Sequence, residues 1–138
     1  RSQTTSMSAD AAEAEALHLA PGAQVHVYDG LSLADGMPVA TFRSTFPAAR
    51  FPDLPQALQR LKSVTEALRE QGVADYTRAS TRLTAKLASP TQALHLHLNP
   101  GAPILRTTAV NVDPDGQPIE YGRTWFAGDR ITLTLTGL

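Results

Sequence analysis

The sequence predicts an α+β domain in which an antiparallel β-sheet carries flanking helices packed to one side. Several short segments alternate apolar and polar residues, as half-buried strands do. Asp-Gly pairs at 35–36 and 115–116 separate such segments and are typical of hairpin turns. Apolar residues recur at helical spacing over 54–72. A chain of 138 residues suits one domain with one core.

A motif of helix end, Pro-Gly, strand, Asp-Gly and strand occurs twice, at 17–46 and at 96–126. The equivalent pairs are Gly22 with Gly101, Gly36 with Gly116, Pro38 with Pro118, Arg43 with Arg123 and Phe46 with Phe126. Two copies are too few for a solenoid, which needs at least three. They predict a pseudo-symmetric sheet built from two hairpins.

Local composition predicts the elements of the first half. Residues 1–10 are polar without periodicity and read as a linker or disordered terminus. Residues 11–20 are rich in Ala, Glu and Leu and predict a helix that Pro21-Gly22 stops. Alternation predicts a strand at 23–33 and its hairpin partner at 38–46.

The middle of the chain predicts two short helices within 54–72, with Gly72 as the stop. Ser63 interrupts the apolar run, and Glu66 follows three residues later, so the pair is a candidate capping box for a second helix. A Thr-rich alternating segment at 75–88 predicts a strand.

The last third predicts one more helix and three strands. Ser89-Pro90 opens a helix that ends at Asn99-Pro100-Gly101. Strands are expected at 102–113, 117–126 and 129–138, the first two joined by the second Asp-Gly turn.

Composition excludes several functional classes. The formal net charge of -1 and the absence of a basic stripe argue against sequence-independent nucleic-acid binding by this chain. No apolar run reaches the roughly 20 residues that a transmembrane helix needs. The chain has no cysteine, which excludes disulfides and fits a reducing, cytoplasmic location. Because it starts at Arg1 rather than Met, we expect a fragment of a longer protein.

Few residues suggest chemistry. His95 and His97 cannot easily share a metal on a helix, and no metal site or cofactor is predicted. Glu120 is either a solvated strand residue or an acceptor for a ligand's hydroxyl or amine. Arg78 and Arg82 lie four apart on one strand, so they are expected on one face. Arginine side chains there could hold phosphate, phosphonate or carboxylate, or form surface salt bridges.

An ordered series of short motifs adds a family resemblance. It runs Leu-x-Pro-Gly-Ala-x-Val, Leu-Ala-Asp-Gly-x-Pro, Ser-Val-Thr-x-Ala-Leu, Thr-Arg-Ala, Pro-Gly-Ala-Pro-Ile-Leu-Arg, Asp-x-Asp-Gly-x-Pro-Ile-Glu-Tyr and Gly-Asp-Arg. Over about residues 12–135 the chain resembles the UTRA domain, the effector-binding domain of the HutC subfamily of GntR transcription regulators. The segment PIEYGRTWFAGDRITL is similar to the phosphonate-metabolism regulators of that subfamily.

The resemblance implies a chorismate-lyase-like fold for residues 11–138, a homodimer and a small-molecule effector. It also implies that DNA is bound by a separate N-terminal winged helix-turn-helix domain, absent from this chain, and that the chain itself is no enzyme. Two alternatives stay open: a chorismate-lyase-like enzyme, and a dimerisation module without a ligand.

The resemblance also implies which residues bind the effector. Ser63 matches a helix start that holds an anion, Glu120 matches a Glu-Tyr strand, and Phe126 stands where many members have a ligand-contacting Tyr. With Thr65, Arg78, Arg82 and Arg43 they form the predicted ligand-binding set, which the two hairpins are expected to gather at one cavity.

One stretch departs from the family pattern. Asp29, Gly30 and Ser32 stand where basic residues that bind a phosphate are expected. A carboxylate beside a phosphate is repulsive. The effector is therefore expected to be less anionic, or to be held by Arg43, Arg78 or Arg82.

Overall fold

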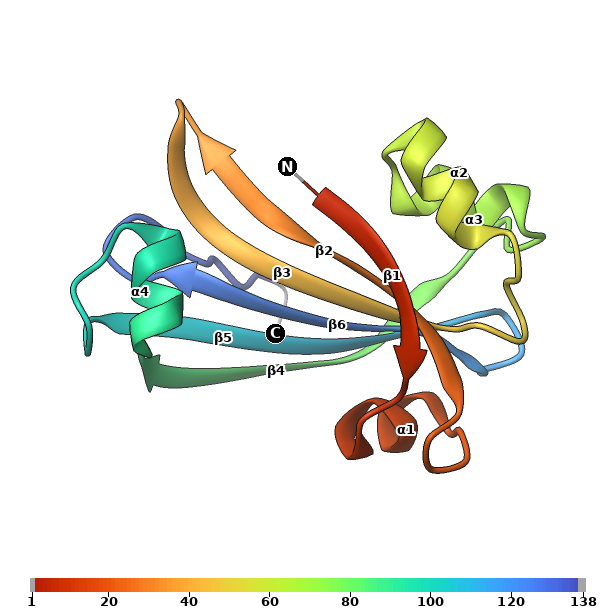
Figure 1. The fold of residues 1–138 in the computed structure, drawn as a ribbon. Helices are drawn as coiled ribbons and strands as arrows, with labels where there is room; N and C mark the ends of the chain where they lie inside the picture. The colour runs from red at the N-terminus through yellow and green to blue at the C-terminus, as the bar shows by residue number, and fades with distance from the viewer. Residues whose placement is uncertain (1, 137–138) are drawn as a thin grey trace.

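The computed structural model describes residues 2–136, which form one six-stranded antiparallel sheet and four helices (Figure 1). The sheet order is β1-β2-β3-β6-β5-β4. The elements are β1 (Ser2–Ser8), α1 (Ala11–Leu17), β2 (Gln24–Ala34), β3 (Met37–Pro47), α2 (Leu54–Leu61), α3 (Val64–Glu70), β4 (Thr77–Leu87), α4 (Pro90–Leu96), β5 (Pro103–Val112) and β6 (Pro118–Ala127).

The two predicted hairpins form the centre of the sheet. They are β2–β3 and β5–β6, and β3 pairs with β6 so that Arg43 lies directly opposite Arg123. At the first turn Asp35 and Gly36 both have positive φ, 51° and 78°, as a type I′ hairpin turn requires. The sequence repeat is therefore a structural repeat, β1-α1-β2-β3 followed by β4-α4-β5-β6, with α2 and α3 between the halves.

The N-terminal segment corrects the expectation of a disordered linker. Ser2–Ser8 is strand β1, antiparallel to β2 over its whole length. Apart from Met7 its side chains are polar, and most are exposed, so hydrophobic alternation gives no signal. Its backbone groups nevertheless pair with the free edge of β2. Arg1 lies outside the described residues.

The expected last strand is also wrong, because residues 131–136 form no strand. Both edges of β6 are already occupied by β3 and β5, so a segment following β6 finds no free edge beside it. Arg130 instead donates to the backbone carbonyls of Pro38, Leu96 and His97, which fixes the end of the domain against α4. Residues 137–138 of that predicted strand lie outside the described residues.

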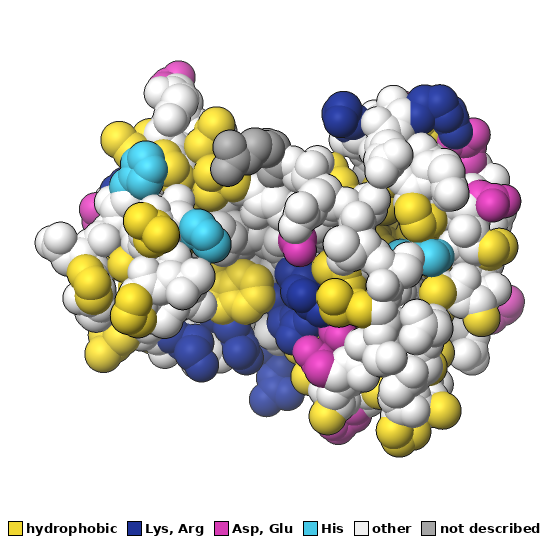
Figure 2. Space-filling view, in the orientation of Figure 1, with side chains coloured by type: hydrophobic (Ala, Val, Ile, Leu, Met, Phe, Trp, Pro, Cys, Tyr) yellow, Lys and Arg dark blue, Asp and Glu magenta, His cyan; other side chains and the backbone are white. Residues whose placement is uncertain are grey.

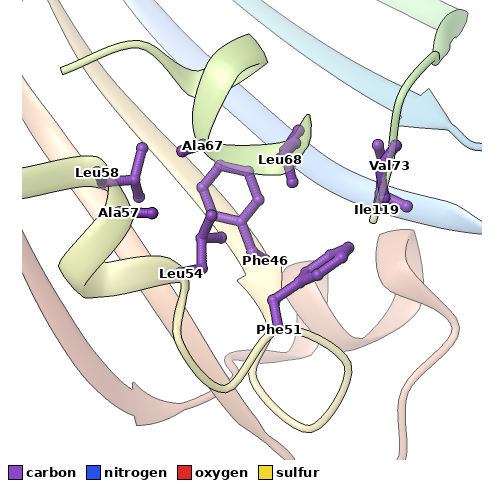
Figure 3. Packing of buried hydrophobic residues seen from close by; sticks show 9 residues of the cluster. All are labelled: Phe46, Phe51, Leu54, Ala57, Leu58, Ala67, Leu68, Val73 and Ile119. Atoms are coloured by element: carbon purple, nitrogen blue, oxygen red, sulfur yellow. The ribbon is translucent and has the colours of Figure 1, made fainter. Parts of the chain in front are cut away.

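The helices cover both faces of the sheet, not one side as predicted. Phe46 packs against α2 and α3 (Figure 3), and Tyr28 packs against the same cluster. Side chains of the opposite alternation point to the other face. There Val27 and Tyr121 belong to one cluster with Leu17 of α1, and Trp125 packs against the cluster that contains Ala93 and Leu96 of α4. We call these the α2/α3 face and the α1/α4 face.

The core on the α2/α3 face holds the two central helices in place. Its buried members are Phe46, Phe51, Leu54, Ala57, Leu58, Ala67, Leu68, Val73 and Ile119 (Figure 3). Two short helices were predicted and are present: Lys62 ends α2 with φ 54°, and the Ser63 hydroxyl accepts the Glu66 N–H at 3.3 Å, half of the predicted capping box. None of the helices formed by residues 2–136 has the length and apolar character to cross a bilayer.

Candidate functional site

Three polar side chains join into a line across neighbouring strands on the α2/α3 face. Arg78 of β4 donates from Nε to Asn111 Oδ1 at 2.8 Å. Asn111 of β5 donates from Nδ2 to Glu120 Oε1 of β6 at 2.9 Å. Arg78 also donates from Nη1 to Thr81 Oγ1 at 3.0 Å. The sheet register places Arg78 opposite Asn111 and Asn111 opposite Glu120, so the backbone itself sets this order.

Two members of this line are buried. Asn111 and Glu120 are each 8% exposed, and Glu120 follows Ile119, whose side chain is in the core. A buried carboxylate is costly unless donors surround it. Asn111 supplies one of them and is itself held by Arg78. Glu120 is therefore a fixed acceptor at the edge of the core.

Sequence reasoning missed Asn111. The available signal was the distance to the turn, because Asn111 lies four residues before Asp115 and Glu120 four residues after Gly116. The sequence does not show that the register shifts between Asn111 and Val112, where Val112 pairs with Pro118, because this depends on which residues pair.

The start of α3 lies over the same face. The Ser63 hydroxyl caps the helix, and Thr65 Oγ1 lies 2.7 Å from the Tyr76 hydroxyl just before β4. Phe126 is also on this face by alternation, but it is six residues from Glu120 along β6, about 20 Å at the rise of an extended strand. The structure thus brings Arg78 and Glu120 together, with Ser63 and Thr65 on the same side and Phe126 at a distance.

Arg82 does not join this group, contrary to the prediction that it shares a face with Arg78. A β-bulge at Ala79 shifts the pairing between Arg78 and Ser80, so Arg78 is opposite Asn111 whereas Arg82 is opposite Thr108. One extra residue inverts the alternation of every residue beyond it. Arg82 therefore lies on the α1/α4 face.

Arg43 is also on the α1/α4 face, where it is committed to an ion network. Glu13 of α1 has no exposed surface, and its Oε2 accepts from Arg43 Nε at 3.1 Å and from Arg123 Nη2 at 2.6 Å. Thr45 Oγ1 donates to the same oxygen at 2.7 Å. The equivalent arginines of the two repeats thus share one carboxylate, and the expected single cavity holding Glu120 and all the arginines is not formed.

The surroundings of Glu13 favour its charged form. Burial alone would raise the pKa of the Glu13 carboxyl. Hydrogen bonds from the Asp10 N–H and the Thr45 hydroxyl, with the charge of Arg43, outweigh burial and hold the pKa below its ordinary value. Asp10 in turn caps α1 and pairs with Arg123 at 3.4 Å.

The residues that depart from the family pattern, Asp29, Gly30 and Ser32, lie on different faces of the sheet. Tyr28 packs into the core on the α2/α3 face, so alternation places Gly30 and Ser32 on that face and Asp29 on the other. Asp29 is paired in the register with Arg43. The Asp29 carboxylate therefore does not face the Arg78–Asn111–Glu120 line, although this part of β2 contributes no cation to it.

A cleft of about 710 Å³ opens on the α1/α4 face, between α4 and β1. Figure 2 shows this face hollowed beside the cyan histidines of the α4 region. The lining residues are Ser2, Gln3, Asp29, Gly30, Leu31, Thr41, Phe42, Arg43, Leu94, His95, His97 and Trp125. Arg43 is the one member of the predicted ligand-binding set among them.

Comparison with known proteins identifies what this arrangement resembles. The model of the UTRA domain matches residues 3–132. The chain is 39% identical over 122 residues to an uncharacterized HTH-type transcriptional regulator of Rhizobium meliloti, covering 88% of this chain and 50% of the relative. It is 28% identical over 128 residues to the HTH-type transcriptional repressor PhnF of Mycolicibacterium smegmatis, covering 93% and 52%. The chain thus spans about half the length of these curated relatives.

Solved structures agree on the fold. PhnF from Mycobacterium smegmatis superposes with a TM-score of 0.84 at 26% identity, over 98% of this chain and 60% of that one. A GntR-family regulator from Bacillus cereus gives 0.87 at 17% identity, over 100% and 98%, which speaks to the fold alone. The α+β, chorismate-lyase-like prediction is confirmed. The named relatives are transcriptional regulators, which confirms the prediction that this chain is no enzyme.

Proposed function

The chain belongs to the UTRA domain family, and from this premise we propose that it senses a small polar metabolite for a transcription regulator of the HutC type. In this proposal the domain is a homodimer in the cytoplasm, and a separate helix-turn-helix domain of the same regulator binds DNA and acts as a repressor. The effector is expected to carry an acidic group, such as a phosphonate, phosphate or carboxylate.

The Arg78–Asn111–Glu120 line is the observation that supports an effector site on the α2/α3 face. Its two ends differ in chemistry: the guanidinium of Arg78 suits an acidic group, and the buried carboxylate of Glu120 suits a hydroxyl or amine. Asn111 bonds to both, so it fixes their spacing. A metabolite with an acid at one end and a donor at the other would meet both requirements at once.

Ser63 and Thr65 would complete this site from the helical side. Both belong to the start of α3, which packs on the same face, and Thr65 is joined to Tyr76 next to β4. Binding at this point would couple the sheet to α3. A ligand that favours one arrangement of these elements shifts the population towards it, and a differential affinity of a few kcal/mol is sufficient to change the state of an attached domain.

The experiment is a thermal-shift screen of phosphonates, sugar phosphates and amino acids against the purified chain. A ligand that binds only the folded state raises the melting temperature, by RT ln(1 + [L]/Kd) in free energy. At least one of these classes should raise it. Arg78→Gln should abolish the rise in melting temperature for an acidic ligand. Glu120→Gln should weaken the binding free energy by about 1–3 kcal/mol, the cost of a lost charged hydrogen bond, and so reduce the rise.

Arg69→Gln is the matched control, because Arg69 is exposed in the last turn of α3, whereas Ser63 and Thr65 are at its start. It should respond to the ligand as the wild-type chain does. A chain that responds to no class would favour the alternative of a dimerisation module without a ligand. A ligand whose effect survives Arg78→Gln and Glu120→Gln would place the site elsewhere, with the cleft on the α1/α4 face as the next candidate.

A further inference from the structure

The cleft on the α1/α4 face has the size and the lining of a ligand site. Its volume of about 710 Å³ is typical of pockets that hold small molecules. Leu31 and Trp125 line it from the sheet and Leu94 from α4, and Figure 2 shows hydrophobic side chains beside this hollow. Leu94 is 74% exposed, so its side chain is available to a bound molecule. The lining therefore suits a ligand with an apolar body.

Asp29 brings a carboxylate into this cleft. It is half-buried on β2, and within residues 2–136 its side chain forms no hydrogen bond or ion pair. Arg43 lies opposite it on β3, but that guanidinium donates to Glu13 Oε2 at 3.1 Å and to the Met7 sulfur at 3.3 Å. A carboxylate that is partly removed from water attracts a cation more strongly than an exposed one does.

The charges beside Asp29 leave it without a counter-ion. Arg43 lies opposite Asp29 and Arg123 lies opposite Arg43, so the three form a row across β2, β3 and β6. Glu13 forms ion pairs with both arginines, and Asp10 pairs with Arg123. Each arginine is therefore already matched by another carboxylate. A bound cation beside Asp29 would complete the charge balance of this part of the face.

Trp125 provides an aromatic surface in the same cleft. Within residues 2–136 no cation and no second ring lies against the Trp125 ring, because the ring contacts in this part of the chain involve other residues. Indole is the side chain that attracts cations best through its face. Arg106 is opposite Trp125 on β5, on the side away from β2, and does not line the cleft.

We infer that this cleft binds an organic ammonium ion. Its positive charge is held by the Asp29 carboxylate and the face of Trp125, and its apolar body lies against Leu31 and Leu94. This site takes a ligand of opposite charge to the acidic effector proposed for the α2/α3 face. It lies on the other face of the sheet and does not rest on that proposal.

Three compounds of matched shape test the charge of the ligand. They are 2-phenylethylamine, which is a cation, 2-phenylethanol, which is neutral, and phenylacetate, which is an anion. Isothermal titration calorimetry of the purified chain should show the amine binding about tenfold more tightly than either of the others. A buffer of about pH 8 keeps the imidazoles of His95 and His97, which also line the cleft, in their neutral form.

Tryptophan fluorescence tests the location, because Trp125 is the one tryptophan of the chain. Its emission should change along the same titration and saturate with the affinity that calorimetry gives. Calorimetric binding of the amine with no change in this emission would place the amine elsewhere and overturn the inference.

Substitutions test the residues. Asp29→Asn keeps the shape of the side chain, removes its charge and should weaken amine binding about tenfold. Asp75→Asn is the matched control, an exposed carboxylate between α3 and β4, and should leave the affinity unchanged. At the exposed Leu94, Leu94→Glu should tighten amine binding about twofold and Leu94→Arg should weaken it by a similar factor. Circular dichroism checks that each variant keeps the fold.

The outcomes separate this inference from the proposed function. An amine that binds no more tightly than 2-phenylethanol, or equally well to the native chain and to Asp29→Asn, would overturn the ammonium site and leave the effector site to its own test. Amine binding that is lost in Glu120→Gln but kept in Asp29→Asn would overturn it too, and would assign the amine to the α2/α3 face. A thermal-shift screen without an acidic ligand would contradict the proposed effector and leave the ammonium site unaffected.

Discussion

At the scale of single residues, Glu13 is a buried carboxylate that forms ion pairs with two arginines. It is fully buried, and the arginines that it holds, Arg43 and Arg123, come from equivalent positions of the two repeats. Pseudo-symmetry sets these two like charges directly opposite each other on β3 and β6. Without an anion between them they would repel. The negative charge of Glu13 therefore offsets the repulsion between Arg43 and Arg123 at the centre of the sheet.

We predict that Glu13→Gln destabilises the domain by about 3 kcal/mol, the lower end of the cost of removing one partner from a buried ion pair. The lower end applies because Arg43 is 28% exposed and can turn towards water. Urea denaturation measures the change. Glu15→Gln alters an exposed glutamate of the same helix and should stay within about 0.5 kcal/mol of the native chain.

The pH dependence of the stability difference between the native chain and Glu13→Gln shows whether charge or packing causes it. Because the folded pKa of Glu13 lies below its ordinary value of 4.5, the stability it contributes is present above about pH 4.5 and is lost as the pH falls through the folded pKa. The Gln variant has no such titration. The gap between the two proteins should therefore narrow below about pH 4. A gap that is constant down to pH 3 would show that packing, not charge, was lost.

At the scale of elements, turn chemistry is the most predictable feature and strand alternation the least reliable one. The Asp35-Gly36 hairpin and the Ser63 break between α2 and α3 depend on residues adjacent in sequence, and both were predicted. The bulge at Ala79 depends on how β4 pairs with β5, and it moved Arg82 to the opposite face. An alternation argument holds only as far as the next bulge.

We predict that Gly36→Ala destabilises the domain by about 1 kcal/mol, because its φ of 78° is strained for a residue with a Cβ. No atom lies within 4 Å of the position that a Cβ would occupy, so the cost is conformational and not steric. Gly36→Asn should recover most of the loss, since Asn tolerates this region better. Thermal denaturation of both variants measures the effect. Equal losses for Ala and Asn would point to a contact of the turn instead.

For the whole molecule, the internal repeat is longer than the two hairpins that reveal it. The N-cap residues Asp10 and Ser89 and the left-handed C-caps His18 and His97 are both 79 residues apart. The same offset places residues 2–8 on residues 81–87, which belong to β4. The repeat could therefore have identified β1, which composition alone reads as a linker.

We predict that deleting residues 1–8 lowers the melting temperature by more than about 5 °C. The deletion uncovers the edge of β2 and removes Ser6, whose hydroxyl bonds to His26 Nδ1 at 2.8 Å, and Met7, which contacts Arg43. Differential scanning calorimetry measures the shift. Removing residues 133–138 is the control and should change it little, because residues 133–136 are exposed outside the sheet. An unchanged melting temperature for the N-terminal deletion would mean that β1 contributes no stability.

The sequence by itself determined the fold class, the two hairpins, the helix boundaries at Ser63 and Ser89, and the family, because caps, turns and ordered motifs are local signals. It also selected Arg78 and Glu120, which the sheet joins through Asn111. Only the tertiary structure decided which face each side chain occupies, that Arg43 pairs with Glu13, and that the helices cover both faces of the sheet. Faces and edges are set by bulges and by pairing between distant strands, and neither leaves a pattern in neighbouring residues.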